Sequence, residues 1–307
     1  MKFRVLGSTG LRVSVVGVGT WQYGGEWGKR FSQAMVDPIL GRAKELGINL
    51  LDTAECYGDH YSESLVGQAL RGQRQQWIVA TKFGHKFHGN FDRTDHFDAA
   101  GAVASVEDSL RALQTDYLDL LQFHSGSDEA FDNAGLWAAL QRLVQSGKVR
   151  HLGISIGSNA NLYQTSRATQ VGAAAIQVIY NRLDRVPEGE VLPSCQAQNL
   201  GVLARVPLAS GLLSGKYQPG ATFTDPDDIR SRRDPAFIEG RLRQVAEIAA
   251  TEVPAGVSMA AWALAWCLQH PAVSCVIPGC KSAEQVELNA AAADLDMVRA
   301  DHPQAVI

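Results

Sequence analysis

Residues 14–24 of this chain read Ser-Val-Val-Gly-Val-Gly-Thr-Trp-Gln-Tyr-Gly, an apolar run that leads into closely spaced glycines. The run at 14–18 predicts a β-strand. The first strand of a doubly wound dinucleotide-binding sheet is usually followed by Gly-x-Gly-x-x-Gly, which cradles a pyrophosphate. Gly17 and Gly19 match this pattern, but Gln22 occupies the position of its third glycine. The stretch therefore argues against an open doubly wound sheet and favours a closed barrel.

Similar apolar runs recur along the chain, each followed by a longer stretch with helical spacing. The eight predicted strands are residues 14–18, 48–51, 77–81, 118–123, 151–154, 174–179, 202–206 and 273–277. The clearest predicted helices are residues 33–46, 62–70, 99–113, 136–146 and 259–269. Several end near a glycine, such as Gly47, Gly72 or Gly147, where a left-handed C-cap is accessible. Eight such units in 307 residues predict an α/β fold, a (β/α)8 TIM barrel.

Two segments lie outside this repeat. Residues 3–5 and 11–13 flank Gly7-Ser8-Thr9-Gly10, which predicts an N-terminal β-hairpin at the bottom of the barrel. Residues 217–235 are rich in Pro, Gly, Asp and Arg and predict a long irregular loop, either functional or disordered. Because no linker divides the chain, residues 1–307 are predicted to form a single barrel domain.

Composition excludes several classes of protein. The formal charge is −4 and no basic stripe dominates, which argues against a nucleic-acid partner. No apolar run is long enough to cross a membrane, and the N-terminus lacks a signal-peptide core. The five cysteines form no CxxC pair and do not have the spacing of metal ligands. His85, His88 and His96 also lack the spacing of metal ligands. We therefore predict a cytoplasmic protein with reduced thiols and no metal site.

Four ionisable side chains follow predicted strands. Asp52 ends the second strand, Tyr57 lies in the loop after it, Lys82 ends the third strand and His124 ends the fourth. The C-terminal ends of barrel strands share one mouth, so these side chains are expected to converge there. Ionisable groups at the ends of apolar strands cost free energy unless they are paired or used.

These residue types suit the reduction of a carbonyl group, in which the oxygen needs a proton donor as hydride reaches the carbon. The pKa of a free tyrosine is about 10, and a nearby ammonium lowers it by stabilising the phenolate. Lys82 is therefore predicted to tune Tyr57 as the general acid, and Asp52 to keep Lys82 charged. His124 is predicted to donate to the substrate carbonyl and orient it.

At these residues the chain resembles the aldo-keto reductase superfamily, in particular its bacterial stress-protein and channel-β-subunit-like branches. Six motifs match in order: Asp-Thr-Ala-Glu-Cys-Tyr-Gly at 52–58 with Ser62-Glu63, then residues 77–82, 116–124, 153–155, 207–217, and 277–279 with Gln285 and Asn289. The match extends over nearly the whole chain, to about Asp296.

The resemblance implies a barrel fold, NADPH/NADP+ as the cofactor, with NADH possible, and a catalytic tetrad of Asp52, Tyr57, Lys82 and His124. The implied cofactor contacts are Thr20, Trp21, Asp52, Ser155, Gln177, Arg205, Pro207, Leu208, Ser210, Gly211, Leu213, Lys216, Gly279, Lys281, Gln285 and Asn289. Of these, Ser155 and Gln177 would hold the nicotinamide carboxamide, the six contacts from Pro207 to Lys216 the diphosphate, and the four from Gly279 to Asn289 the adenosine. The predicted substrate contacts are Trp21, Tyr23, Tyr57 and His124.

The chain departs from the family pattern at several positions. Ile156 stands where many members have an asparagine that holds the carboxamide, and Leu288 stands where a glutamate commonly meets the adenine amine. Arg205 replaces an aromatic residue, so guanidinium packing is expected instead of ring stacking on the nicotinamide. Residues 301–307 match poorly, which leaves open whether a C-terminal substrate loop is present.

The charges suggest a choice of cofactor. Lys281 lies where the 2′-phosphate of NADPH would sit, and a cation there favours NADPH over NADH. An alternative is that Lys281 is merely a solvated lysine at a helix start. Arg230, Arg232 and Arg233 would clasp the diphosphate from the loop at 217–235, or form a solvated run.

Each catalytic candidate also has a purely structural interpretation. Tyr57 alone reads as a surface tyrosine, Asp52 as a helix cap, and Lys82 as a solvated strand end. His124 alone reads as a core histidine. Together these interpretations require four coincidences at one mouth. For Trp21 and Tyr23, aromatic core packing competes with a role in the substrate pocket.

Three functions fit the sequence. The first is an NADPH-dependent oxidoreductase that acts on a small carbonyl or alcohol substrate. The second is a cofactor-binding regulatory or interaction subunit with weak residual reductase activity, against which the intact tetrad argues. The third is a barrel isomerase or hydrolase of sugar phosphates. It predicts a glycine-rich phosphate-binding loop after the seventh strand, and Ala209-Ser210-Gly211 is only a weak match to such a loop. The natural substrate, the direction of reaction and the oligomeric state are not predicted.

Overall fold

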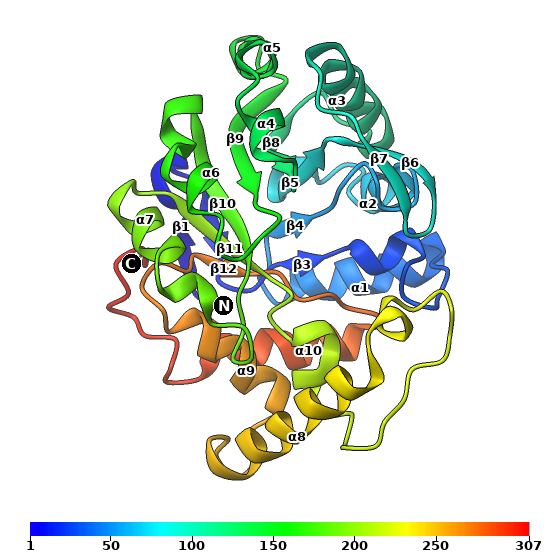
Figure 1. The fold of residues 1–307 in the computed structure, drawn as a ribbon, viewed down its shortest axis with the longest axis vertical. Helices are drawn as coiled ribbons and strands as arrows, with labels where there is room; N and C mark the ends of the chain where they lie inside the picture. Colours follow the sequence, from blue (N-terminus) through cyan, green and yellow to red (C-terminus); the bar gives the residue numbers. More distant parts are fainter. Residues whose placement is uncertain (307) are drawn as a thin grey trace.

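The structure, a computed structural model that describes residues 1–306, is built on eight parallel strands curled into a barrel (Figure 1). The strands are β3 (Val18–Gly19), β4 (Leu50–Asp52), β5 (Ile78–Phe83), β8 (Leu118–His124), β9 (Val149–Ser155), β10 (Ala173–Ile179), β11 (Gly201–Arg205) and β12 (Cys275–Val276). They pair in the order β12-β11-β10-β9-β8-β5-β4-β3. Parallel bridges between Val16 and Val276 and between Gly19 and Gly279 join the two outer strands. The predicted barrel is confirmed.

Helices form the outer layer of this barrel (Figure 1). They are α1 (Gln33–Glu45), α2 (Tyr61–Ala69), α3 (Ala99–Leu113), α4 (Asp128–Phe131), α5 (Ala134–Gln145), α6 (Leu162–Ser166), α7 (Val191–Ala197), α8 (Pro235–Thr251), α9 (Met259–Leu268) and α10 (Ala283–Ala290). In α1, the buried residues Val36, Ile39, Leu40 and Ala43 follow helical spacing and turn one face inward. Helix α9 is buried on all sides, because α10 and the turn at 209–214 pack against it.

The bottom of the barrel is closed by the predicted hairpin, whose strands are β1 (Phe3–Val5) and β2 (Arg12–Ser14). Leu6 and Val13 from this hairpin are fully buried and join the apolar layer inside the barrel. The Ser8 amide donates to the Asn199 carbonyl, two residues before β11 begins, so the hairpin lies at the N-terminal ends of the strands. The mouth at the opposite ends is left free for function.

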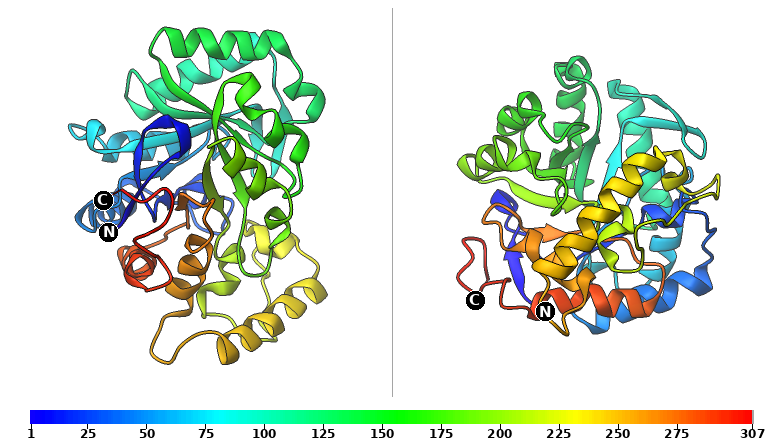
Figure 2. Two further views of the ribbon diagram at one scale, coloured as in Figure 1. Left: turned by 90° about the vertical axis from the view of Figure 1, so that its left-hand side faces the viewer. Right: turned by 60° about the horizontal axis from the view of Figure 1, so that its bottom comes forward.

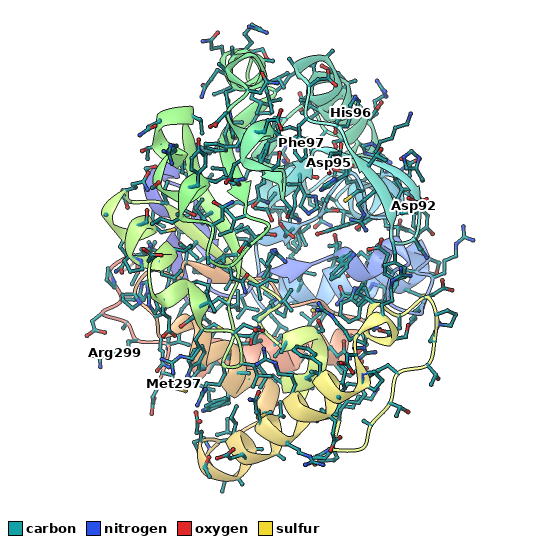
Figure 3. All side chains as sticks on the ribbon, in the orientation of Figure 1. Asp92, Asp95, His96, Phe97, Met297 and Arg299 are labelled. Atoms are coloured by element: carbon teal, nitrogen blue, oxygen red, sulfur yellow. The ribbon has the colours of Figure 1, made fainter. Side chains whose placement is uncertain are left out.

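The end of the chain also lies at the bottom. The Val5 amide donates to the Gln304 carbonyl over 2.8 Å, and the Val306 amide donates to the Phe3 carbonyl over 3.0 Å. Figure 2 accordingly places the two termini close together. In Figure 3, Met297 and Arg299 lie at the edge of the molecule opposite to Asp92 and Asp95. The described C-terminal residues, up to residue 306, therefore lie at the bottom of the barrel, away from its mouth.

Some elements differ from the prediction. Strands β3 and β12 span two residues each, shorter than the predicted 14–18 and 273–277, because the flanking apolar residues are buried without continuing the ladder. The antiparallel hairpin of β6 (His85–Gly89) and β7 (Asp92–Asp95) was not predicted. Its strands are polar and mostly exposed, so they show no apolar run. In residues 1–306, no helix combines the length and apolarity needed to cross a bilayer.

The loop predicted at 217–235 is ordered against the mouth. It contains a short 3-10 helix at Ile229–Arg232, and α8 begins at Pro235. Asp228 forms a β-bridge with Trp27, and the Ile229 amide donates to the Glu26 carbonyl over 3.2 Å. The loop after β3 and the loop before α8 thus form one wall beside the mouth.

Candidate active site

A pocket of about 450 Å³ opens at the C-terminal ends of the barrel strands. Asp52, His124 and Arg205, the last residues of β4, β8 and β11, line it. Tyr57, from the loop after β4, lines it beside them. The strand ends therefore deliver four of the predicted side chains to one cavity, as the barrel geometry requires.

Lys82 lies directly behind this cavity, on β5, with none of its surface exposed. Its Nζ donates to Asp52 Oδ2 over 2.8 Å, to the Thr53 carbonyl over 2.7 Å and to Tyr57 Oη over 3.1 Å. These three bonds use the three donors of an ammonium group. Burial lowers the pKa of Lys82, but Asp52 and Tyr57 together raise it by more, so that the net shift is upward. Lys82 is therefore a fixed, fully paired cation that touches the phenol.

The phenol of Tyr57 responds to two opposing effects. Burial raises the pKa of Tyr57 to about 12, and the ammonium of Lys82 opposes this rise by stabilising the phenolate. The expectation that Lys82 would bring this pKa below the ordinary value of a tyrosine is therefore not met, because burial outweighs the ammonium. Tyr57 is a phenol throughout the neutral pH range, with a cation placed to receive the charge that remains when its proton leaves.

His124 lies next to Tyr57, with ring centroids 6.2 Å apart in an edge-to-face arrangement. Burial lowers the pKa of His124 well below its usual value, and the positive charge of Lys82 lowers it further. The imidazole is therefore neutral. Its Nδ1 lies 3.7 Å from Cys56 Sγ. A neutral imidazole beside a phenol supplies hydrogen bonds without adding charge.

A network of amides holds Asp52 from the other side. Gln177 Nε2 donates to Asp52 Oδ1 over 2.6 Å, and Gln122 Nε2 donates to the same oxygen over 3.3 Å. Ser155 Oγ lies 3.5 Å from Gln177 Oε1. Asp52 is thus satisfied by Lys82 and by two buried amides, which fixes both oxygens of the carboxylate.

Two contacts position the loop that bears Tyr57. A Cβ on Gly24 would lie 2.6 Å from the backbone carbon of Tyr57, so only glycine lets the two loops approach this closely. Glu55, two residues before Tyr57, accepts from the His85 amide over 2.7 Å and from the Ser105 hydroxyl. Burial raises the pKa of Glu55 to about 8. The loop is thereby anchored both to the loop after β3 and to the start of β6.

Aromatic and charged residues form the wall above Tyr57. The Trp21 and Tyr57 rings are nearly parallel, with centroids 6.3 Å apart. Glu26 is fully buried and accepts from Trp21 Nε1 and from Arg93 Nη2, while Arg93 Nη1 donates to Cys56 Sγ over 3.2 Å. This wall unites the loop after β3 with the β6–β7 hairpin and faces the space where a substrate carbonyl would approach Tyr57.

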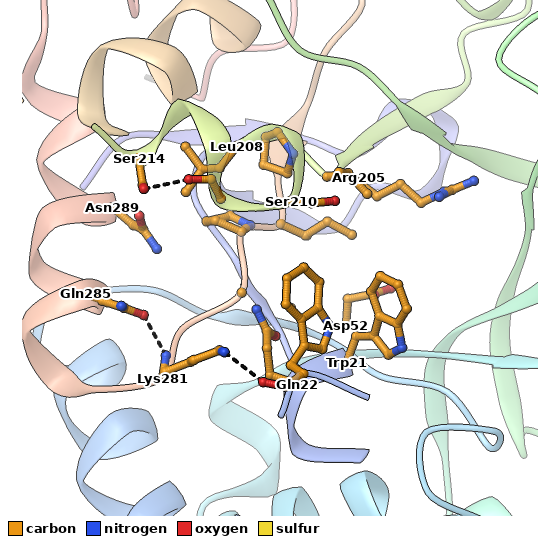
Figure 4. Close-up of a pocket in the computed structure, with 18 of the residues that line it drawn as sticks. Trp21, Gln22, Asp52, Arg205, Leu208, Ser210, Ser214, Lys281, Gln285 and Asn289 are labelled. Carbon is orange, nitrogen blue, oxygen red and sulfur yellow. Dashed lines mark hydrogen bonds between the residues drawn. The ribbon is translucent and has the colours of Figure 1, made fainter. Parts of the chain in front are cut away.

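The other end of the pocket is built for anionic and polar groups. Figure 4 places Trp21 and Arg205 at one end, and Lys281, Gln285 and Asn289 at the other. Lys281, Lys216 and Arg230 line the cavity, and Asp52, paired with Lys82, is the only carboxylate among the residues described as lining it. A Cβ on Gly279 would lie 1.5 Å from the amide nitrogen of Gln22, so a larger residue there would have to displace the end of the Gln22 side chain.

The turn after β11 has an unusual backbone. Val206, Ala209 and Ser210 have positive φ angles of 53°, 48° and 57°, although none of them is a glycine. Such conformations cost free energy and concentrate at ligand sites. Together with Gly211, this turn presents Pro207, Leu208, Ser210 and Gly211 to the pocket.

Most predicted contacts line the pocket. They are Trp21, Asp52, Tyr57, His124, Gln177, Arg205, Pro207, Leu208, Ser210, Gly211, Lys216, Gly279, Lys281, Gln285 and Asn289. Four predicted contacts are not among the lining residues described: Thr20, Tyr23, Ser155 and Leu213.

These four side chains contact the interior of the protein instead of the pocket. Thr20 Oγ1 donates to the Asp52 carbonyl over 3.0 Å, and Ser155 lies behind Gln177. Tyr23 is fully buried and packs on Phe31 with ring centroids 4.8 Å apart. Leu213 is fully buried in the core. Trp21 and Tyr23 lie two residues apart in the 3-10 helix Trp21–Gly24, where such residues point to different sides, so Trp21 turns toward the mouth and Tyr23 toward the core.

Several lining residues were not predicted as contacts. They are Gly19, Gln22, Trp27, Arg93, Ser125, Val206, Ser214, Tyr217, Ala260, Ile277, Pro278 and Leu288. Arg230, left undecided, also lines the pocket, where it is paired with Asp228 and donates to Tyr217 Oη over 2.9 Å. Gln122 was missed as a partner of Asp52, although it precedes His124 by two residues in a strand and must therefore face the same side.

The arrangement has a definite chemical capability. A phenol whose oxygen contacts an ammonium releases its proton more readily than an isolated buried phenol, because the phenolate is stabilised at once. A neutral imidazole next to it holds the acceptor oxygen in place. The long cationic arm of the pocket accommodates a phosphate-bearing ligand. The site therefore suits proton donation to an oxygen beside a bound nucleotide.

Comparisons with known proteins agree with this geometry. The family model described as Aldo/keto reductase family matches residues 15–305. The aldo-keto reductase YhdN of Bacillus subtilis (strain 168) is 33% identical over 298 residues, which cover 94% of this chain and 87% of the relative. The holo form of the aldo-keto reductase AKR11C1 from Bacillus halodurans superposes with a TM-score of 0.80 at 30% identity, covering 100% of this chain and 98% of that one. An aldo-keto reductase from Klebsiella pneumoniae, solved in complex with NADPH, gives a TM-score of 0.72 at 29% identity, with coverages of 96% and 90%.

Proposed function

Because this chain belongs to the aldo/keto reductase family, whose members are NAD(P)H-dependent oxidoreductases, we propose that it uses NADPH to reduce the carbonyl group of an aldehyde or ketone. One observation carries the proposal: Lys82 Nζ lies 3.1 Å from Tyr57 Oη and 2.8 Å from Asp52 Oδ2, and both of these partners line the pocket of about 450 Å³. The complex of the Klebsiella relative with NADPH supports the choice of cofactor.

The residues of the pocket fit such a cofactor. Lys281, Lys216 and Arg230 provide positive charge for its phosphates, and Gln177 provides an amide for its carboxamide. The strained turn at 206–211 leaves room for a ligand next to the backbone. When bound, the nicotinamide supplies the hydride for the carbonyl carbon.

The roles of the tetrad follow from the contacts. Tyr57 Oη donates its proton to the substrate oxygen, and the ammonium of Lys82 stabilises the phenolate that remains. Asp52 keeps Lys82 protonated and in place. His124 donates to the substrate oxygen as a neutral imidazole and so orients the carbonyl. Trp21 and Arg93, both in the wall above Tyr57, confine the substrate against Tyr57.

The pKa shifts predict opposite pH dependences for the two directions. Reduction needs protonated Tyr57 and neutral His124. Because burial raises the pKa of Tyr57 to about 12 and lowers that of His124, kcat for reduction should stay constant from about pH 7 to about pH 10. Oxidation of the alcohol needs the phenolate, so kcat should rise about tenfold per pH unit over the same range. Steady-state kinetics in both directions measure this; a decline of reduction below pH 9 would count against Tyr57 as the acid.

Lys281→Ala should weaken the binding of NADPH more than that of NADH. Lys281 Nζ donates to the Trp27 carbonyl over 3.1 Å and is half-buried at the adenosine end of the pocket, where the 2′-phosphate is expected. A charge-assisted hydrogen bond contributes about 1.5–3 kcal/mol, so Kd for NADPH should rise by about tenfold or more. Fluorescence titration with both cofactors tests this. Equal losses for NADPH and NADH would show that Lys281 does not recognise the 2′-phosphate.

The proposed function is tested by following NADPH consumption with a panel of sugars, small aldehydes and aromatic ketones. Turnover of at least one class is the expected result. Binding of NADPH without turnover of any of them would instead favour the regulatory subunit, and the absence of binding would favour a phosphate-sugar isomerase or hydrolase. The intact tetrad, in which Lys82 donates to both Asp52 and Tyr57, favours the enzyme, because a subunit that only binds has no use for a buried ammonium against a phenol.

A further inference from the structure

We propose that Arg205 sets the relative affinity of the site for the two redox forms of the cofactor: its guanidinium, unpaired with any carboxylate, favours binding of the reduced, uncharged nicotinamide ring over the oxidised, positively charged ring. This inference rests on the proposed function and deepens it, because it concerns how the same site distinguishes the two forms of its cofactor.

At the end of the pocket that holds Tyr57 and His124, one cation has no negatively charged partner. Lys82 is paired with Asp52, and Arg93 is paired with Glu26. Among residues 1–306, no carboxylate lies within ion-pair distance of Arg205. Its Nη2 donates to the Ile156 carbonyl over 3.1 Å, and its Nε is buried without a hydrogen-bond partner. The net charge around the reacting groups is therefore close to +1.

The position of Arg205 brings this charge to the reacting groups. The residue ends β11, and its side chain crosses the end of β10 to reach Ile156, which follows the last residue of β9. It lines the pocket together with Tyr57 and His124, and Figure 4 shows it at the end of the pocket that holds Trp21. The proton from Tyr57 and the hydride must reach the two ends of one carbonyl bond, so the nicotinamide is expected beside Tyr57, at this end of the pocket.

The field of Arg205 already acts on its neighbours. The pKa of His124 is lowered first by burial and then by several positive charges, among which are Lys82 and Arg205. A charge that disfavours an imidazolium also disfavours an oxidised nicotinamide at a similar distance. In reduction, an electron pair leaves the neutral ring as hydride, and the ring becomes positive while Tyr57 becomes a phenolate. The guanidinium repels the positive ring and stabilises the phenolate, so its effect on the ring alone is measured when the oxidised cofactor binds without a substrate.

The test exploits the fact that only the ring differs in charge between the two cofactor forms. The dissociation constants of NADP+ and NADPH are measured by quenching of tryptophan fluorescence, since Trp21 and Trp27 line the pocket. Because NADP+ is disfavoured in the wild type, the ratio Kd(NADP+)/Kd(NADPH) should fall about tenfold in Arg205→Gln, and it should stay near the wild-type value in Arg205→Lys.

Lys216→Gln is the matched control. It removes one positive charge from the other end of the same pocket, where the phosphates carry equal charge in both redox forms. We expect it to weaken both cofactors together and to leave the ratio unchanged. The same shift of the ratio in Arg205→Gln should appear with NAD+ and NADH, because the 2′-phosphate plays no part in it.

Two outcomes would overturn the proposal, and they are distinguishable. If both cofactor forms bind to the wild type and Arg205→Gln leaves their ratio unchanged, the redox role of Arg205 is refuted while the proposed function stands. If neither form binds to the wild type, the proposed function fails and the inference fails with it.

Discussion

Tyr57→Phe should lower kcat for carbonyl reduction by about 10²- to 10⁴-fold, the usual contribution of a positioned general acid. The substitution removes only the hydroxyl that accepts a hydrogen bond from Lys82, and the ring still packs beside Trp21. The cofactor phosphates are held elsewhere in the pocket, so Kd for NADPH should change by less than about threefold. Steady-state kinetics and a fluorescence titration of the same protein separate the two effects.

A second tyrosine provides the control. Tyr61, in α2, donates through its hydroxyl to the Phe31 carbonyl over 2.7 Å and lies outside the pocket-lining residues described. Tyr61→Phe should cost about 1 kcal/mol of stability and leave kcat nearly unchanged. If Tyr57→Phe kept most of its activity, another group would have to be the proton donor.

Lys82→Met should cause a loss of activity of similar size together with a loss of stability. Without the ammonium, the phenolate of Tyr57 is no longer stabilised, and Asp52 is left as a buried carboxylate held only by amides. Breaking a buried ion pair by removing one partner costs about 3–5 kcal/mol. Urea denaturation and steady-state kinetics measure the two effects separately.

The double variant Asp52→Asn with Lys82→Met distinguishes structure from chemistry. It removes both charges, so it should regain most of the lost stability while kcat stays as low as in Lys82→Met. Lys86→Met, an exposed lysine in the neighbouring β6, serves as the control and should alter neither quantity. Recovery of kcat in the double variant would refute the role of Lys82 as the cation beside the phenol.

The central part of the site could be predicted because barrel geometry alone determines it. Asp52, Lys82 and His124 sit at or near the ends of parallel strands, and such ends meet at one mouth whatever the intervening helices are. Gln122 was equally accessible to this reasoning, since side chains two apart in a strand share a face. Tyr23 could not be placed by this reasoning, because it lies in the segment after β3, where no strand pattern predicts which way a side chain points.

The wall of the pocket could not be predicted for a different reason. Glu26 and Arg93 are 67 residues apart, and Arg93 lies in a hairpin whose polar strands show no periodic apolar signal. The direction in which the pKa of Tyr57 shifts could not be predicted either, since it depends on how completely the folded chain buries the phenol. The missing carboxylate near Arg205 is likewise a property of the folded site rather than of any motif.

The most direct test of the account is to follow the hydrogen atoms themselves. Wild-type protein is incubated with NADPH that carries deuterium at both C4 positions of the nicotinamide and with an aldehyde that the panel identifies as a substrate, and the alcohol is analysed by mass spectrometry. The account predicts one deuterium on the carbinol carbon of each product molecule, and loss of this product in Tyr57→Phe. An alcohol without deuterium, or labelled alcohol formed equally fast by Tyr57→Phe, would contradict it.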